Sequence, residues 1–268
     1  MILVEHRRWL LLAMAFVALI AFACSSGDDG ATTTQAPAAA PTSAPAPLAV
    51  EPTVSQLVIA TQPVSFETNN PLRDGGVTSG FALKPMFESL IGYDAIAGAL
   101  VPQLATSWSV EPNGKSIRFK LRENVPFHNG NGNFSAADVV YSHSVITADD
   151  STHSHSRQYK DATVEVVNDH EIIFRLTKPQ AELLQSISEQ ISALEIQSAA
   201  DFEALGESPS ASTRPLAGTG AYQYVEREQG QSVLFERVPY EHWRYQPDFQ
   251  ELQFRWMNEA STRLAALL

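Results

Sequence analysis

The chain has 268 residues, of which 44% are hydrophobic, and its formal net charge at pH 7 is −12. This length allows one large or two small domains with a buried core. The acidic balance argues against a nucleic-acid partner, which calls for a basic surface. A single cysteine leaves no internal disulfide framework.

The start of the chain is typical of an export signal. The basic residues 6–8 precede an uncharged apolar run over 9–23, which is shorter than a membrane span of about 20 residues. Cys24 follows directly, and this junction is similar to a bacterial lipobox, in which the cysteine carries the lipid. We therefore expect a signal peptide over 1–24, lipidation of Cys24, and an exported protein anchored to the cell membrane. Ala21 and Phe22 depart from the usual pattern, so an ordinary signal peptide or an uncleaved anchor stays open.

Residues 25–52 predict a disordered tether. They include no aromatic residue and five prolines, and such a segment buries too little apolar surface to offset its chain entropy. After a lipid-bearing cysteine, this tether would let a globular body work away from the bilayer.

Alternating apolar and polar residues predict several strands in the remainder. The clearest covers 116–124, where Ile117, Phe119 and Leu121 share one side and charged residues take the other. Asn113–Gly114 favours a hairpin turn leading into it, and Ala97–Gly98 is an earlier turn signal. The other expected strands are a pair over 162–179 turning at Asn168–Asp169, a pair over 221–239 turning near Gln229–Gly230, and one strand over 249–257.

Three helices are expected between and after these strands. Ser135 is a plausible N-cap and Asp138 completes an acidic variant of the capping box, which predicts a helix over 135–150. The second helix is expected over 181–202, with an apolar stripe of Leu184, Ile187, Ile191 and Leu194. The third is expected over 259–268. The mixture of helices and hairpins indicates an α/β or α+β protein with a mixed sheet.

A search for catalytic motifs finds none. The chain has no G-x-S-x-G elbow, no H-E-x-x-H pair and no P-loop. The segment "GTGAY" at 218–222 has two glycines of a dinucleotide fingerprint but lacks the third, and it precedes a strand. We therefore predict no catalytic residue and no cofactor, and this absence favours binding over turnover.

Histidine and aromatic residues are the remaining candidates for a site. His143, His153 and His155 lie near Asp149 and Asp150, and such groups can ligate a transition metal. A solvated loop is the preferred interpretation, so no metal site is predicted. His128 is interpreted as a turn residue. Aromatic side chains that either line an apolar cleft or, as we prefer, pack in the core are Trp108, Trp243, Trp256, Tyr240 and Tyr245.

Several short motifs follow one another in a specific order along the chain. They are "FESLIGYD" at 87–94, "PQLATSW" at 102–108, "NGKSIRFKLR" at 113–122, "VPFHNG" at 125–130, "SAADVVYS" at 135–142 and "PLAGTGAY" at 215–222. This series resembles family 5 of the bacterial extracellular solute-binding proteins, the dipeptide, oligopeptide and nickel receptors of ABC importers. Ala221 stands where the family usually has proline, and Val238–Pro239 replaces an Asn-centred pair.

The resemblance implies an α/β fold of the type II periplasmic-binding class, which closes on its ligand by hinge motion. Residues 53–90 and 200–268 would form the first domain, with a first strand near Leu57–Gln62. Residues 91–199 would form an inserted small subdomain. The opposing lobe would be absent, so the chain is expected to be an N-terminal fragment of a longer protein.

The resemblance also implies the function. The protein would capture a peptide or similar small solute outside the cytoplasmic membrane and deliver it to an ABC permease and ATPase complex, without catalysis. In this chain, the residues expected to bind the ligand are Thr61, Gln62 and Phe66 after the first strand, with Met86 and Glu88. One alternative is a signalling receptor or chaperone-like module on the same fold that is not coupled to transport. Another is a secreted hydrolase, for which the sequence shows no nucleophile motif.

Overall fold

The computed structural model describes residues 55–64, 66–73, 81–180, 182–191, 194–206 and 214–265. The predicted signal peptide, Cys24 and the predicted tether over 25–52 lie outside these residues. Within the described part of the chain, no helix is both long and apolar enough to span a membrane.

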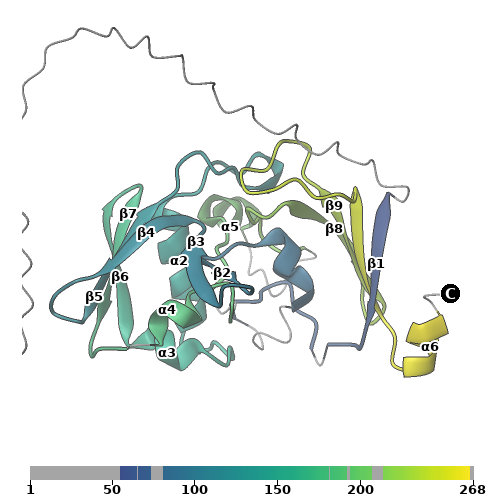
Figure 1. Ribbon diagram of the computed structural model, residues 1–268, viewed down its shortest axis with the longest axis horizontal. Helices are drawn as coiled ribbons and strands as arrows, with labels where there is room; N and C mark the ends of the chain where they lie inside the picture. Colours follow the sequence, from purple (N-terminus) through teal and green to yellow (C-terminus); the bar gives the residue numbers. More distant parts are fainter. Residues whose placement is uncertain are drawn as a thin grey trace, which may run out of the picture. The chain divides into compact units, whose positions relative to one another are not determined.

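The first sheet joins the start of the described chain to its end. Its strands lie in the order β1-β10-β9-β8, with β1 parallel to β10 and the other neighbours antiparallel (Figure 1). The predicted turn at Gln229–Gly230 and the predicted last strand are confirmed, whereas β1 lies one residue earlier than predicted. The bounds are β1 (Gln56–Thr61), β8 (Tyr222–Glu228), β9 (Ser232–Arg237) and β10 (Glu251–Trp256).

One face of the first sheet is apolar because its strands alternate. A short 3-10 helix, η1 (Phe81–Met86), packs against this face. Strand β1 is at the sheet edge, and its Leu57, Val58 and Ile59 are exposed. The buried cluster consists of Ala82, Leu83, Met86, Phe87, Tyr222, Val233, Phe235, Leu252, Phe254 and Trp256.

The second sheet is fully antiparallel, in the order β4-β5-β7-β6. Its strands are β4 (Ala105–Val110), β5 (Ser116–Leu121), β6 (Ala162–Asn168) and β7 (Glu171–Leu176). The turn at Asn113–Gly114 is confirmed, with the Asn113 side chain accepting from the Lys115 N–H at 2.8 Å. The turn between β6 and β7 occupies residues 169–170, one residue later than predicted.

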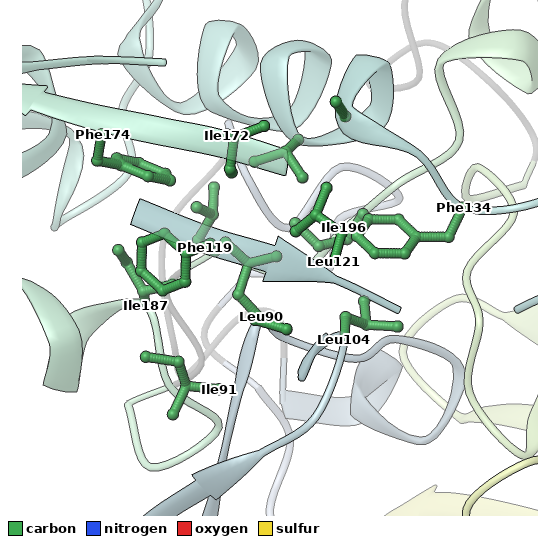
Figure 2. Close-up of a cluster of buried hydrophobic side chains, with 14 of the residues drawn as sticks. Leu90, Ile91, Leu104, Phe119, Leu121, Phe134, Ile172, Phe174, Ile187 and Ile196 are labelled. Atoms are coloured by element: carbon green, nitrogen blue, oxygen red, sulfur yellow. The ribbon is translucent and has the colours of Figure 1, made fainter. Parts of the chain in front are cut away.

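The larger core lies on one face of the second sheet. The predicted alternation is confirmed for Ile117, Phe119 and Leu121 on β5, and for Ile172, Phe174 and Leu176 on β7, all of which are buried. Figure 2 shows Phe119, Leu121, Ile172 and Phe174 from the two strands gathered in one cluster with Ile187 and Ile196. A separate hairpin, β2 (Ile91–Asp94) with β3 (Ala99–Pro102), turns at the predicted Ala97–Gly98.

Helix α2 (Ala136–Thr147) begins where its capping residues predict. The capping box is present, and the Asp138 carboxylate accepts from the Ser135 N–H at 2.9 Å. The other oxygen of Asp138 accepts from the N–H of Ala199, also at 2.9 Å, at the start of α5 (Ala199–Leu205). Burial raises the pKa of Asp138 despite these hydrogen bonds. One carboxylate thus joins the N-termini of two helices.

The predicted helix over 181–202 is wrong. Of the described residues in this range, only those of α4 (Leu183–Ser186) and the start of α5 are helical, and residues 194–198 belong to no helix or strand. The backbone N–H groups of this segment donate to other chain segments: Ile196 to Glu88 O at 2.9 Å, and Ser198 to Ala217 O at 3.0 Å. The apolar side chains of the predicted stripe are buried or partly buried in the larger core. Leu184 reaches it from α4, Ile187 and Ile191 from the turn that follows, and Leu194 from a segment outside any helix.

Three short helices complete the described chain. They are η2 (His128–Gly130), α3 (Ser156–Lys160) and α6 (Ala260–Ala265). The last one confirms the start of the helix predicted over 259–268, whose final three residues lie outside the described ones.

Candidate functional site

The loop after β1 begins where the strand ends. Because β1 and β10 are parallel, their carboxyl ends lie together at one end of the first sheet, and open α/β sheets bind ligands at the carboxyl ends of their strands. The two ends are joined, since the N–H of Met257 donates to Thr61 O at 2.8 Å. Gln62 is exposed, and Phe66 is exposed over 55% of its surface. Ser65 lies outside the described residues.

Three hydrogen bonds join the same loop to strands β8 and β10 and to the β8–β9 turn. Glu67 Oε1 accepts from the indole Nε1 of Trp256 at 2.6 Å and from the N–H of Gly230 at 2.9 Å. The Arg227 guanidinium donates to Thr68 O at 3.0 Å. The loop is therefore tied both to the end of β10 and to the β8–β9 hairpin.

Met86 and Glu88 lie away from solvent. Met86 belongs to the buried cluster under the first sheet. The side chain of Glu88 is 4% exposed, and its Oε2 accepts from Thr219 Oγ1 at 2.9 Å and from Trp243 Nε1 at 3.1 Å. The structure therefore separates these two residues from the exposed side chains of Gln62 and Phe66.

Glu88 lies in a junction to which several of the family-like motifs contribute. We call this the Glu88 junction; it consists of Met86, Glu88, His128, the loop 217–220, His242 and Trp243. His128 Nε2 lies 2.8 Å from Gly220 O and His242 Nε2 lies 2.9 Å from Thr219 O. Since a carbonyl oxygen only accepts, each Nε2 carries the hydrogen. Burial lowers the pKa of His128 to about 4, so this ring is neutral near pH 7.

The glycines of "GTGAY" are required by close approach of two backbones. A Cβ on Gly218 would lie 1.9 Å from Met86 O, and one on Gly220 would lie 2.4 Å from Pro85 O. The N–H of Gly220 donates to Met86 O at 3.0 Å. The motif therefore has a packing role that does not involve a phosphate.

Asp201 holds the start of the loop 217–220 in place. Its carboxylate pairs with both terminal nitrogens of Arg214 at 2.8 Å and accepts from the N–H of Ala217 at 2.8 Å. Burial alone would raise the pKa of Asp201, but these hydrogen bonds outweigh it and hold the pKa below its ordinary value. Sequence reasoning missed Asp201 and His242 and included Thr219 only as part of "GTGAY". The hydrogen bond of Thr219 to Glu88 spans 131 residues, so no local pattern could indicate it.

The histidine candidates of the sequence lie in different surroundings. His143 and His153 are buried, and His143 Nε2 donates to Tyr159 O at 3.2 Å. His155 Nδ1 lies 3.1 Å from Gln158 Oε1. Across the described ranges, no group of three or more His, Cys, Asp or Glu side chains is arranged to hold a metal ion.

The aromatic candidates divide between core and surface. Trp256 is buried, as preferred, while Trp108 and Trp243 are partly buried against the larger core. The Arg122 guanidinium lies 4.0 Å from the centre of the Trp243 ring. Tyr245 is half exposed, and Tyr240 lines a surface hollow of about 340 Å³ at the other end of the first sheet. A second hollow, of about 830 Å³, lies between α3 and α4. Neither hollow is lined by the five residues expected to bind the ligand.

The comparisons with known proteins agree on one family. The sequence model of the bacterial extracellular solute-binding proteins, family 5, middle region, matches residues 99–268. A probable ABC transporter periplasmic-binding protein of Escherichia coli is 27% identical over 200 residues, which are 68% of this chain and 36% of that protein. Di/tripeptide-binding protein 2 of Pseudomonas aeruginosa is 25% identical over 195 residues, 66% of this chain and 36% of that protein.

Solved structures show the same fold. A dipeptide-binding protein from Pseudoalteromonas sp. SM9913, in complex with Met-Leu, superposes with a TM-score of 0.70 at 21% identity, covering 79% of this chain and 45% of that one. A binding protein from A. tumefaciens R10, in complex with mannopinic acid, gives 0.70 at 24% identity, covering 80% and 43%. The fold is therefore that of the periplasmic binding proteins, and the chain spans less than half the length of these relatives.

Proposed function

The chain belongs to family 5 of the bacterial extracellular solute-binding proteins, and from this premise we propose that the protein is the substrate-binding component of an ABC importer. It captures a peptide or similar small solute and delivers it, chemically unchanged, to the permease and its ATPase. The observation that carries the proposal is the family match over residues 99–268, together with relatives named for di- and tripeptide binding.

The proposed domain organisation is the one predicted from the sequence. Residues 53–90 and 200–268 form the first domain and 91–199 the inserted subdomain, and a lobe beyond this chain closes over the solute. This last element is supported by the relatives, of which the chain spans 36%.

The proposed solute contacts come from the loop after β1. Thr61, Gln62 and Phe66 contact the solute, because they lie at the carboxyl edge of the sheet and two of them are exposed. Met86 and Glu88 are buried, and we propose that they act indirectly, by holding the loop 217–220 through the hydrogen bonds of Gly220 to Met86 O and of Thr219 to Glu88. An exposed aromatic beside polar groups is the composition of many small-molecule sites.

The experiment is solute binding by the protein at the full length its gene encodes. The protein is purified from its host under native conditions, and native mass spectrometry identifies any bound solute. Thermal unfolding is then followed with dialanine, trialanine and free alanine. We expect a peptide to be retained and the melting temperature to rise with peptide concentration. Conversion of the peptide into products, or no bound solute and no rise with any of the three, would contradict the proposal.

Export and lipid anchoring are proposed from the sequence around Cys24. Labelled palmitate supplied to the host should be incorporated into the protein and not into the Cys24→Ala variant. Equal labelling of the two forms would exclude a lipid on Cys24.

A further inference from the structure

We infer that Glu67 is a positioning residue, which fixes the loop after β1 so that Phe66 is held in the orientation that receives the solute. The inference rests on the proposed function and deepens it, since it concerns the same site. Glu67 itself does not touch the solute; it acts through the loop.

The first reason is that Glu67 joins three distant parts of the chain. Its Oε1 accepts from Trp256 Nε1, 189 residues away, at 2.6 Å, and from the N–H of Gly230, 163 residues away, at 2.9 Å. A charged acceptor makes each of these hydrogen bonds stronger than a neutral pair. The loop is therefore fastened to β10 and to the tip of the β8–β9 hairpin by one side chain.

The second reason is the positive charge of Arg227, whose guanidinium contacts the loop. Arg227 donates to Thr68 O at 3.0 Å, and its Nε is buried without a hydrogen-bond partner among the described residues. Burial lowers the pKa of Arg227, and the negative charge of Glu67 opposes that effect. Removing Glu67 leaves the positive charge of Arg227 less compensated. The loop then loses the hydrogen bonds of Glu67, and the hydrogen bond from Arg227 to Thr68 O is weakened as well.

The third reason is what the fastened loop presents. Phe66 is adjacent to Glu67 in the chain, yet 55% of its surface is exposed. An apolar ring held out from a fixed backbone needs little further ordering when a ligand arrives. Such preorganisation raises affinity because less conformational entropy is lost on binding.

A purely structural role makes different predictions from a positioning role. If Glu67 only stabilised the sheet edge, its loss would lower global stability and leave the loop and the affinity of the folded protein unchanged. If it positions the loop, local exchange and affinity change together in a protein that remains folded.

The test compares four variants of the full-length protein. Glu67→Ala removes the acceptor, and Glu67→Gln keeps an oxygen that can accept. Trp256→Phe removes the indole donor together with part of a buried ring. The matched control is Glu251→Ala, because Glu251 is also a carboxylate that accepts from a distant side chain. Its donor is Gln56 on β1, at 3.0 Å, and this hydrogen bond lies at the opposite end of the β1–β10 pair. Hydrogen exchange is measured without ligand at the amides of Gly230 and Met257, which donate to Glu67 and to Thr61 O. Affinity is measured for dialanine and trialanine.

We expect Glu67→Ala to exchange these amides about tenfold faster and to bind peptide about tenfold more weakly, as for loss of a charged hydrogen bond. Glu67→Gln keeps an acceptor but loses the charge, so its losses should lie between those of the parent and Glu67→Ala, as should the losses in Trp256→Phe. Glu251→Ala should leave both measurements unchanged. Trp256→Phe also keeps the test valid if Glu67→Ala fails to fold.

Unchanged exchange and affinity in Glu67→Ala would overturn the inference, as would equal losses in Glu67→Ala and the Glu251→Ala control. If the parent protein binds neither peptide while the exchange results are as expected, the proposed peptide ligand fails and the fastening of the loop by Glu67 is still observed.

Discussion

The Glu88 junction and the loop after β1 differ in where their side chains point. In the junction, Glu88, Thr219 and His242 are buried and directed at one another. In the loop, Glu67 turns inward while Gln62 and Phe66 face solvent. Three of the six motifs that carried the resemblance contribute residues to the junction, and the loop has no motif.

This difference separates two kinds of information in one chain. Residues that hold the fold must match several neighbours at once, so they appear as recognisable motifs such as "GTGAY" and "SAADVVYS". Residues exposed at a binding edge satisfy only the ligand, so their types follow no fixed pattern. The motifs therefore identify the family, and the exposed loop is where the choice of solute is expected to lie.

The largest effect on the free energy of unfolding is expected when a methyl group is added to a glycine of the Glu88 junction. Gly218→Ala should destabilise the protein by about 4 kcal/mol or more, because the new Cβ would lie 1.9 Å from a backbone oxygen that cannot move away alone. The control is Gly114→Ala, a turn glycine with φ +65° and no close neighbour, which should cost about 1–2 kcal/mol. Urea unfolding of both variants measures the difference, and equal midpoints would show that the junction is not closely packed.

The next effect concerns the ion pair that supports the junction. Asp201→Asn should cost about 3 kcal/mol, the lower end for a buried pair, because the Arg214 side chain is still 40% exposed. Asp161→Asn, at the more exposed pair with Lys178, should cost less than about 1 kcal/mol.

The pH dependence of this pair has a definite sign. The pKa of Asp201 is lower in the folded protein, so the unfolded state binds more protons at acidic pH. The stabilisation is fully present above the ordinary carboxyl pKa and is lost as pH falls through the folded value. Asp201→Asn should flatten the acid limb of the stability curve, and an unaltered limb would contradict the assignment.

Glu195 should produce the opposite pH dependence. Burial raises its pKa to about 7, and only Lys84 acts against this shift as a nearby charge. Between the ordinary carboxyl pKa and pH 7 the folded state binds more protons, so stability falls as pH rises. Glu195→Gln should therefore be more stable than the parent at pH 8, by at most about 3 kcal/mol, and should converge with it near pH 4.

The control for this pH series is Glu203→Gln, which alters an exposed carboxylate on α5. Its stability curve should run parallel to that of the parent from pH 4 to pH 8. A Glu195→Gln curve that does the same would mean that Glu195 is ionised in the folded protein without a penalty.

The smallest effect on stability is expected in the loop. Phe66→Ala should change the free energy of unfolding by less than about 0.5 kcal/mol, as is usual for surface positions. Peptide affinity should nevertheless fall about tenfold or more, because exposed aromatics often dominate binding. Val110→Ala, at an equally exposed apolar residue on β4, should change neither quantity. Unchanged affinity in Phe66→Ala would remove the loop from the proposed site.

Much of the fold could be predicted because its signals are local. The alternation of Ile117, Phe119 and Leu121 encodes the pleat of β5, and Ser135 with Asp138 encodes the start of α2. Turn glycines such as Gly114 fixed the hairpins within one residue. Each of these signals depends on neighbours along the chain, so no knowledge of the tertiary structure was needed.

The candidate site was less accessible to sequence reasoning. Gln62 and Phe66 were chosen through the family resemblance, and the same reasoning grouped them with Glu88, which is buried elsewhere. The partners of Glu67 are 163 and 189 residues away, so no local pattern could indicate that this side chain faces inward.

The sequence by itself determined the strands, the helix cap and the family, because these depend on periodicity and on short ordered motifs. Only the tertiary structure decided that 181–202 is not one helix, and that Gly218 and Gly220 serve close backbone contact. The physical reason is that an apolar stripe reports which side chains leave water. The backbone conformation depends on which hydrogen-bond partners lie nearby, and for Ile196 and Ser198 those partners are Glu88 and Ala217.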